Sequence, residues 1–166
     1  MLGAGLMWGA QLARPAVASD APSELTHTDT HKPPFSLDDL NQEPVSLADR
    51  RRDIVLVHFI ATWCEPCREE LPALNRLVAR SDRSQLRVVT ISVAEVDVRV
   101  RNFVEKLPVN FPILLDRDRS VAKSWNVSAL PTTFILDHNL KPRLFVERDY
   151  DWDRLDVGQL QKSFGE

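Results

Sequence analysis

The sequence is poor in glycine, and this scarcity excludes several kinds of nucleotide-binding site. Its 166 residues include only five glycines, and none of them lies between Gly9 and Gly158. The dinucleotide-binding fingerprint and the P-loop both need glycines where the backbone approaches a phosphate closely. Neither motif is present, and we expect no cofactor. With so little glycine, Asn41 and Asn139 are the expected positive-φ residues of the turns.

The chain also lacks an excess of positive charge. It has 21 Lys and Arg residues against 24 Asp and Glu residues, for a formal net charge of -3. A protein that neutralises several phosphates of a nucleic acid normally has a basic face. The run Arg50-Arg51-Arg52 is short, and we interpret it as a solvated loop. We therefore expect no nucleic-acid partner.

Cysteine is scarce as well, since Cys64 and Cys67 are the only two. A disulfide between them would close a loop too short to restrict the unfolded chain much, which argues against a purely stabilising function. A structural zinc site needs four ligands, and only one closely spaced cysteine pair exists. His27 and His31 lie four residues apart, but in a polar, proline-flanked segment that does not favour a helix. We therefore expect no metal site, and metal binding by the CxxC pair is kept as an alternative.

The N-terminal apolar segment is too short to span a bilayer, which takes about 20 residues. Residues 1–13 carry no charge, and residues 16–18 (Ala-Val-Ala) have the small-x-small pattern that precedes signal-peptide cleavage. No Lys or Arg precedes the apolar segment, so a truncated anchor is the alternative. We predict a signal peptide or truncated anchor over residues 1–18, a flexible linker over 19–33 and one domain over 34–166.

Patterns typical of strands and helices alternate from residue 34 onward. Residues 53–61 and 86–94 are nearly continuous apolar runs, typical of strands buried on both faces of a parallel sheet. Helical periodicity follows each run, and an antiparallel pair is expected over 132–137 and 142–149. The sequence therefore predicts an α/β fold. Its central mixed sheet would have helices on both faces and an added N-terminal β-hairpin over residues 35–47.

The position of the two cysteines favours redox chemistry. They follow a predicted buried strand and open a predicted helix, which places Cys64 near the helix N-terminus. Unpaired N–H groups and the helix dipole favour a thiolate there, and the thiolate is the attacking species in disulfide exchange. Cys67 would lie one turn further on, where it can displace a mixed disulfide. A CxxC motif beside a βαβ pattern is a specific signal for this chemistry.

Three separated motifs occur in a characteristic order: residues 34–74, which contain TWCEPCREELPAL, then residues 104–137, which contain SALPTTFILD, and then residues 150–161. On these motifs the sequence resembles the thioredoxin-like superfamily. Within it, the chain most resembles the TlpA/ResA/DsbE-like branch of extracytoplasmic thiol-disulfide oxidoreductases. The resemblance extends over most of the chain and implies a thioredoxin-like fold.

The resemblance also implies roles for individual residues. Cys64 resembles the nucleophile and Cys67 the resolving thiol, and the pair would form a redox-active disulfide. Glu70 resembles a buried acid that tunes the cysteines, with a surface helix charge as the alternative. Pro131 resembles the cis-proline that faces the disulfide. The expected substrate-binding residues are Trp63, Leu130, Pro131 and Thr132.

Two residues in and near the CxxC motif bear on how it would function, His58 and Glu65. His58 lies where thioredoxins have a buried aspartate and where this branch often has asparagine. It is a candidate proton relay to Cys67, with a hydrogen-bonded core residue as the alternative. Glu65 places a negative charge beside Cys64. That charge opposes the thiolate and stabilises the disulfide, which favours a reductase over an oxidase.

Together these observations predict a reductase of protein disulfides that is periplasmic, or membrane-anchored and facing the periplasm. The branch implies a membrane thiol electron donor, and it implies clients such as apocytochrome c or a copper-assembly factor. We expect a monomer. A disulfide-forming oxidase and a copper chaperone that uses the CxxC pair are the alternatives.

Overall fold

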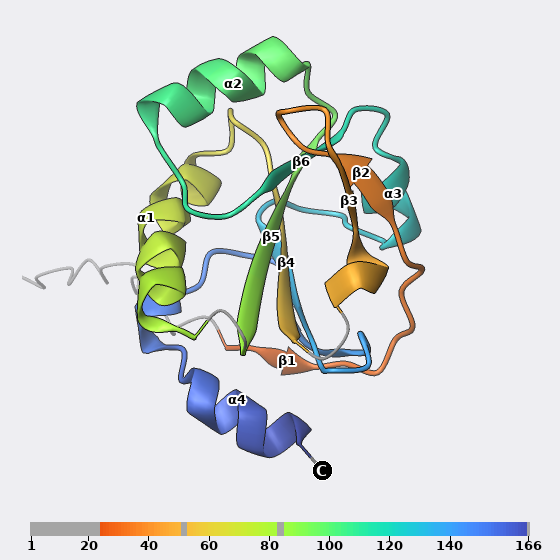
Figure 1. Ribbon diagram of the computed structural model, residues 1–166, viewed down its shortest axis with the longest axis vertical. Coiled ribbons are helices and arrows are strands. Elements are labelled where there is room, and N and C mark those ends of the chain that lie inside the picture. The colour runs from red at the N-terminus through yellow and green to blue at the C-terminus, as the bar shows by residue number, and fades with distance from the viewer. Residues whose placement is uncertain (1–23, 51–52, 83–84, 166) are drawn as a thin grey trace, which may run out of the picture.

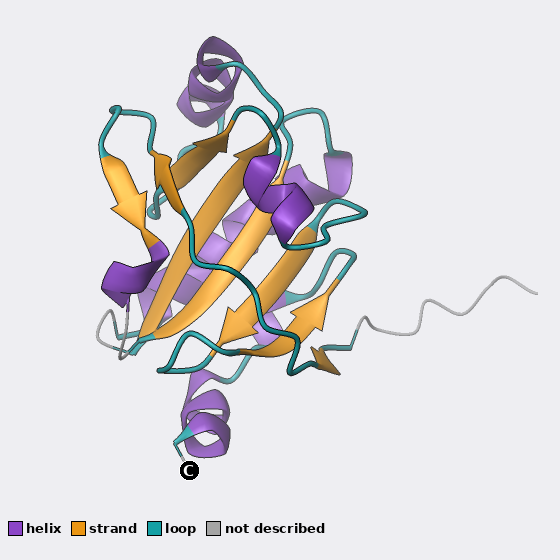
Figure 2. Ribbon diagram, turned by 90° about the vertical axis from the view of Figure 1, so that its right-hand side faces the viewer, coloured by secondary structure: helices purple, strands orange, loops and turns teal. Residues whose placement is uncertain are grey.

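The computed structural model describes residues 24–50, 53–82 and 85–165 (Figures 1 and 2). The predicted signal peptide or anchor over residues 1–18 lies outside the described residues. The strands are β1 (Thr26–His27), β2 (Ser36–Asp38), β3 (Pro44–Ser46), β4 (Ile54–Ile60), β5 (Leu86–Val93), β6 (Ile113–Asp116), β7 (Thr132–Leu136) and β8 (Pro142–Val146). The helices are α1 (Glu65–Arg80), α2 (Asp97–Lys106), α3 (Ser120–Ser124) and α4 (Val157–Phe164), with short 3-10 helices η1 (Leu47–Arg50) and η2 (Trp152–Arg154).

The main sheet is mixed, as predicted. Its strand order is β1-β8-β7-β4-β5-β6, so β4 lies at the centre. β4, β5 and β6 run parallel to one another, whereas β7 pairs antiparallel with β4, and β8 and β1 continue the antiparallel half. β2 and β3 form the predicted separate hairpin.

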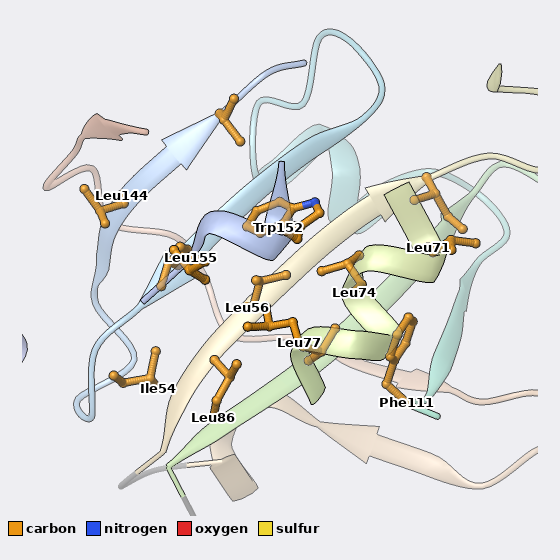
Figure 3. Packing of buried hydrophobic residues seen from close by; sticks show 14 of the residues in the cluster. Ile54, Leu56, Leu71, Leu74, Leu77, Leu86, Phe111, Leu144, Trp152 and Leu155 are labelled. Atoms are coloured by element: carbon orange, nitrogen blue, oxygen red, sulfur yellow. The ribbon is translucent and has the colours of Figure 1, made fainter. Parts of the chain in front are cut away.

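Both faces of the sheet are covered, which confirms the predicted layers (Figure 1). Alternate residues of β4 face opposite sides: Leu56 and Ile60 pack in the same core as α1 and α4, and Val57 and Phe59 pack in the core that contains α3 residues. Figure 3 shows the α1 side, where Trp152 of η2 lies with Leu56 and Leu74. Burying a large aliphatic side chain contributes about 1.5–3 kcal/mol, so packing on both faces stabilises the position of β4.

Part of the predicted flexible linker is ordered against the sheet. β1 pairs with β8, with Thr26 opposite Phe145. Lys32 donates from Nζ to the Trp125 carbonyl (2.5 Å), and the Trp125 indole N–H donates to the Pro33 carbonyl (3.0 Å). The polar composition of this segment did not reveal that its backbone would pair with the edge strand β8.

The turns place positive φ one residue later than expected. Gln42 (φ 65°) and Leu140 (φ 62°) have this conformation, and Asn41 and Asn139 do not. In each turn, hydrogen bonds to the side chain of an aspartate set the backbone conformation. In the first turn, Asp39 Oδ1 accepts the N–H groups of residues 41 and 43. Asp137 Oδ1 accepts those of residues 139 and 141 in the same way. The aspartate thus fixes the turn, and the residue after the asparagine takes the left-handed conformation.

Candidate active site

The carboxyl ends of the three parallel strands meet at one edge of the sheet. After β4 comes the segment that contains Cys64, after β5 comes Glu95, and after β6 comes Arg119. In open α/β sheets, ligand sites lie beyond the carboxyl ends of such strands. This edge is therefore the place where the fold brings chemically active side chains together.

Cys64 and Cys67 form a disulfide at the N-terminus of α1, with their Cα atoms 5.3 Å apart. Cys64 is the N-cap residue, and its Sγ accepts the backbone N–H of Cys67 (3.3 Å). Pro66 occupies the first turn, where its missing N–H costs no hydrogen bond. Cys64 is 5% exposed and Cys67 only 1%. The local geometry thus gives Cys64 the N–H donor that would favour a thiolate there, and it places Cys67 on the inner side.

Glu70 lies one turn after Cys67 and is buried, 4% exposed. Its Oε1 accepts the Tyr150 backbone N–H (2.6 Å) and the Trp152 indole N–H (2.8 Å). The pKa of Glu70 is raised to about 8: burial raises it most, the Tyr150 and Trp152 N–H donors lower it, and the charge of Asp149 raises it. Glu70 is therefore a buried acid and not a surface helix charge, and it can gain or lose a proton close to neutral pH.

His58 lies in the middle of β4 and is fully buried. Its Nδ1 is 2.8 Å from Thr133 Oγ1 on β7, and its Nε2 is 3.7 Å from Glu70 Oε2. Burial lowers the pKa of His58 to about 3. Near neutral pH the two side chains are thus a neutral imidazole facing a carboxylic acid, and not an ion pair.

A groove of about 310 Å³ extends from Trp63 to the residues before the cis-proline. Trp63, the residue before Cys64, is 68% exposed and lines it. Arg119 contributes its one charged side chain, and no ion pair of this residue is found among the described residues. The other lining residues are apolar or small: Val93, Ala94, Val127, Ser128, Ala129 and Leu130.

The predicted substrate-binding residues after α3 have different surroundings. Leu130 is half-buried and lines the groove. The Leu130–Pro131 peptide bond is cis, as the resemblance implies. The side chain of Thr132 is buried, and its hydroxyl donates to the Ala129 carbonyl (2.7 Å). Thr132 therefore holds the loop in place, and its side chain does not face the groove.

Glu65 is highly exposed, and its carboxylate contacts Arg68 (3.2 Å). The expected effect of Glu65 on Cys64 is reduced by this contact, because Arg68 partly compensates the negative charge. Solvent screening of two exposed groups reduces it further.

Sequence reasoning missed Glu95, which anchors the segment before the cysteines. Glu95 is 6% exposed and accepts hydrogen bonds from the Thr62 N–H (2.8 Å), the Thr62 hydroxyl (2.5 Å) and the Ser92 hydroxyl (2.8 Å). Val96 and Val98 follow it and are each 62% exposed. One local signal was available: a glutamate directly after a buried strand, at the same edge as the CxxC motif.

The described residues contain no group of three or more His, Cys, Asp and Glu side chains that could hold a metal ion. His27 lies in β1, at the opposite edge of the sheet from β6. No helix in the described part of the chain has the length and apolar character needed to cross a membrane.

A cysteine pair at a helix N-terminus, on a mixed sheet of this topology, defines a thioredoxin-like protein. The AhpC/TSA family matches residues 29–143, and the chain belongs to that family.

Relatives within the resembled branch share clear sequence similarity with the chain. Thiol-disulfide oxidoreductase ResA from Bacillus subtilis is 37% identical over 105 residues, which cover 63% of this chain and 59% of that protein. ResA from Geobacillus kaustophilus is 36% identical over 107 residues, with coverage of 64% and 62%. The chain thus spans about three fifths of the length of these curated relatives.

Solved structures confirm the fold. A Chlorobium tepidum protein assigned as a thiol:disulfide interchange protein DsbE superposes with a TM-score of 0.73 and 25% identity, over 84% of this chain and 98% of that one. StoA from Bacillus subtilis superposes with a TM-score of 0.64 and 23% identity, over 82% and 98%. The relatives and neighbours confirm the resemblance to the TlpA/ResA/DsbE-like branch.

Proposed function

We propose that this protein is a thiol-disulfide oxidoreductase that reduces disulfides of client proteins outside the cytoplasm. The observation that carries the proposal is the Cys64–Cys67 pair at the N-terminus of α1, where Cys64 Sγ accepts the Cys67 N–H. The names of the relatives support the same activity.

The reaction begins from the reduced pair. The Cys64 thiolate attacks one sulfur of the client disulfide, a mixed disulfide forms, and the other client sulfur leaves as a thiolate. Cys67 then loses its proton and attacks Cys64 Sγ, which releases the second client thiolate. Two electrons pass from the cysteine pair to the client, the client thiolates take up two protons, and a dithiol donor must reduce the enzyme again.

Glu70 is the proposed base for the second step. In the disulfide form it holds a proton near neutral pH, because burial raises its pKa to about 8. The ionised fraction of Glu70, which grows as pH approaches 8, can accept the Cys67 proton, since Cys67 lies one helical turn away on the buried side of α1. Proton transfer from the buried Cys67 would then need no direct access of water.

The groove is the proposed client site. Its apolar lining and the exposed Trp63 suit an extended segment with an apolar residue next to the client cysteine. Arg119 suits an acidic side chain or a carboxylate on the same segment. An apocytochrome c or a copper-assembly factor remains a candidate client, and a membrane thiol protein the candidate donor.

The location outside the cytoplasm is also part of the proposal. It is supported by the apolar segment over residues 1–13 and the Ala-Val-Ala pattern that follows it. An oxidising compartment would supply the client disulfides on which the enzyme acts.

The reduction potential of the Cys64–Cys67 couple tests the direction of transfer. It is read from tryptophan fluorescence in defined thiol buffers, because Trp63 lies beside the disulfide. A value near that of thioredoxin, about -270 mV, is expected for a reductase. A value near that of the strong oxidant DsbA, about -120 mV, would make the protein a disulfide donor. No reversible couple, with stoichiometric Cu(I) binding by the reduced protein, would favour a copper chaperone.

Cys67→Ser tests the client site, because it should trap the mixed disulfide at Cys64. Two disulfide-containing peptides that differ only in Glu or Lys beside the cysteine are offered in competition. Arg119 should favour the Glu peptide by a few-fold, as for an exposed ion pair of about 0.5 kcal/mol. Arg119→Glu should reverse the preference, and Arg148→Glu, at an exposed arginine outside the groove, is the control. Equal trapping of both peptides would exclude charge selection by Arg119.

A further inference from the structure

In the described part of the chain, a small group of buried polar atoms without partners joins α1 to the strands β4 and β5. Among the residues that the structure describes, three buried side-chain atoms have no hydrogen-bond partner: His58 Nε2, Glu70 Oε2 and Thr90 Oγ1. His58 Nε2 and Glu70 Oε2 lie 3.7 Å apart, and Thr90 is the register neighbour of His58 on β5. A buried polar atom without a partner is costly, so three of them in one place call for a reason.

The hydrogen bonds of Glu70 decide which oxygen carries its proton. Oε1 accepts two N–H groups, from Tyr150 and Trp152, and therefore remains an acceptor. A protonated Glu70 must carry the hydrogen on Oε2, because a proton on Oε1 would point at those donors. The Oε2 proton then lies on the side of the carboxyl group that faces His58 Nε2.

The Thr133 hydroxyl gives His58 a way to follow this proton. A hydroxyl can both donate and accept, so it can pair with Nδ1 in either neutral tautomer of the imidazole. When Glu70 is protonated, the unprotonated Nε2 can face the Oε2 proton, and Nδ1–H can donate to Thr133 Oγ1, 2.8 Å away. When Glu70 is ionised, Nε2–H can point toward Oε2, 3.7 Å away, and Nδ1 can accept from the hydroxyl. His58 can remain uncharged in both states.

We propose that His58 is a positioning residue for Glu70. Its Nε2 faces the exchangeable proton that the Oε1 hydrogen bonds place on Oε2, and its change of tautomer allows Glu70 to release that proton. The use of this proton in the resolving step rests on the proposed function. The placement of the proton does not, since it follows from the contacts of the disulfide form alone.

Other charged and polar groups around His58 and Glu70 also affect the pKa of Glu70, and the experiment must separate their effects from that of His58. Asp149 raises the pKa of Glu70, and the Tyr150 and Trp152 N–H donors lower it. Cys67 lies one turn away on α1, and in the disulfide form it does not titrate. On the strand side, Thr133 and Thr90 contribute hydroxyls and no charge. Asp149 is thus the charged neighbour that a control variant must address.

Nuclear magnetic resonance of the disulfide form tests the proposal without any client. Carboxyl ¹³C shifts follow Glu70, and imidazole ¹⁵N shifts follow His58, which is the one fully buried histidine among the described residues. We expect the ¹⁵N signals of His58 to change at the same pH at which Glu70 titrates, while the ring remains neutral. Imidazole signals that do not change through the Glu70 titration would overturn the proposal.

Three substitutions sharpen the test. His58→Gln keeps a polar group at the position of Nε2, His58→Asn keeps one only at the position of Nδ1, and His58→Leu keeps neither. The Glu70 midpoint should rise by about one pH unit in the Leu and Asn variants, and it should stay near the wild-type value in the Gln variant. Equal midpoints in all three would contradict a positioning role.

Asp149→Asn is the matched control. It should lower the Glu70 midpoint and leave the coupled change in His58 intact. If the His58 variants do not fold, the wild-type titration alone decides. A protein inactive in every exchange assay would refute the proposed function and leave this titration as a separate result.

Discussion

Glu70 and Glu95 are both buried glutamates near the CxxC motif, one in α1 after Cys67 and the other bound to Thr62 before Cys64. Their carboxyl groups accept different sets of hydrogen bonds. Glu95 receives three hydrogen bonds that engage both of its oxygens, from Thr62 and Ser92. Glu70 receives two, both on Oε1, and its Oε2 faces the His58 imidazole without a hydrogen bond. A buried carboxyl group with few donors favours its protonated form, and the pKa of Glu70 is raised accordingly. Glu95, by contrast, uses both oxygens to hold Thr62 and Ser92 in place.

The largest expected effect comes from removing the Glu70 carboxylate. Glu70→Gln should slow release of the mixed disulfide about 100-fold at neutral pH, because Cys67 loses its proton acceptor. Stopped-flow measurement of the lifetime of the mixed disulfide checks this value. Glu69→Gln, at the exposed neighbouring position, and Glu95→Gln should each keep the wild-type lifetime. An unchanged lifetime in Glu70→Gln would show that Glu70 is not the base that accepts the Cys67 proton.

The stability of the oxidised protein should have opposite pH slopes from the two members of the Glu70–His58 pair. The pKa of His58 is lowered from 6.5 to about 3, so its contribution is present above pH 6.5 and is lost as pH falls toward 3. The pKa of Glu70 is raised from 4.5 to about 8, so its contribution is present below pH 4.5 and is lost as pH rises toward 8. Each slope approaches about 1.4 kcal/mol per pH unit, and between pH 4.5 and 6.5 the two oppose each other.

Urea unfolding at a series of pH values measures these slopes. Glu70→Gln should abolish the loss of stability between pH 6.5 and 8 relative to the wild type. His58→Leu should abolish the gain between pH 3 and 4.5. Parallel curves for the wild type and both variants would mean that neither group has a shifted pKa.

Glu95→Gln should cost about 1–3 kcal/mol of stability, because the amide nitrogen cannot accept hydrogen bonds from Thr62 or Ser92. The pH dependence of exchange should stay unchanged, since Glu95 is not placed to take the Cys67 proton. Urea denaturation measures the first value, and a rate profile against pH tests the second. Glu105→Gln, at an exposed position in α2, controls for the loss of one negative charge. A shifted rate profile in Glu95→Gln would show that Glu95, like Glu70, affects proton transfer during disulfide exchange.

The smallest effect is expected at Glu65, the exposed glutamate between the cysteines. Glu65→Gln should raise the reduction potential by about 10 mV or less, because Arg68 and solvent already compensate its charge. Arg68→Gln should lower the potential by a similar amount. Redox titration of the two variants in parallel provides the check, and a large change in Glu65→Gln would restore the stronger effect expected from the sequence.

Much of the fold could be predicted because its signals are local. The apolar runs of β4 and β5, the helix that follows the cysteines and the β2–β3 hairpin are all present where their patterns indicate. The positive-φ residues were misplaced by one position, because the side chains of Asp39 and Asp137 decide the turn geometry. The strand β1 was missed because its pairing with β8 joins residues that are far apart in the sequence.

The sequence by itself determined the CxxC pair, its position at a helix N-terminus and the α/β architecture, since each depends on residues close together along the chain. Only the tertiary structure decided that Glu70 is buried, that His58 Nε2 faces it from β4 and that Glu95 holds Thr62. The contacts that bury and position these residues span long stretches of sequence: 12 residues from His58 to Glu70, 33 from Thr62 to Glu95 and 82 from Glu70 to Trp152. Side-chain packing sets the burial, and burial together with the number of donors sets the charge of a carboxylate. For that reason the same residue type, glutamate, has three different environments around one pair of cysteines.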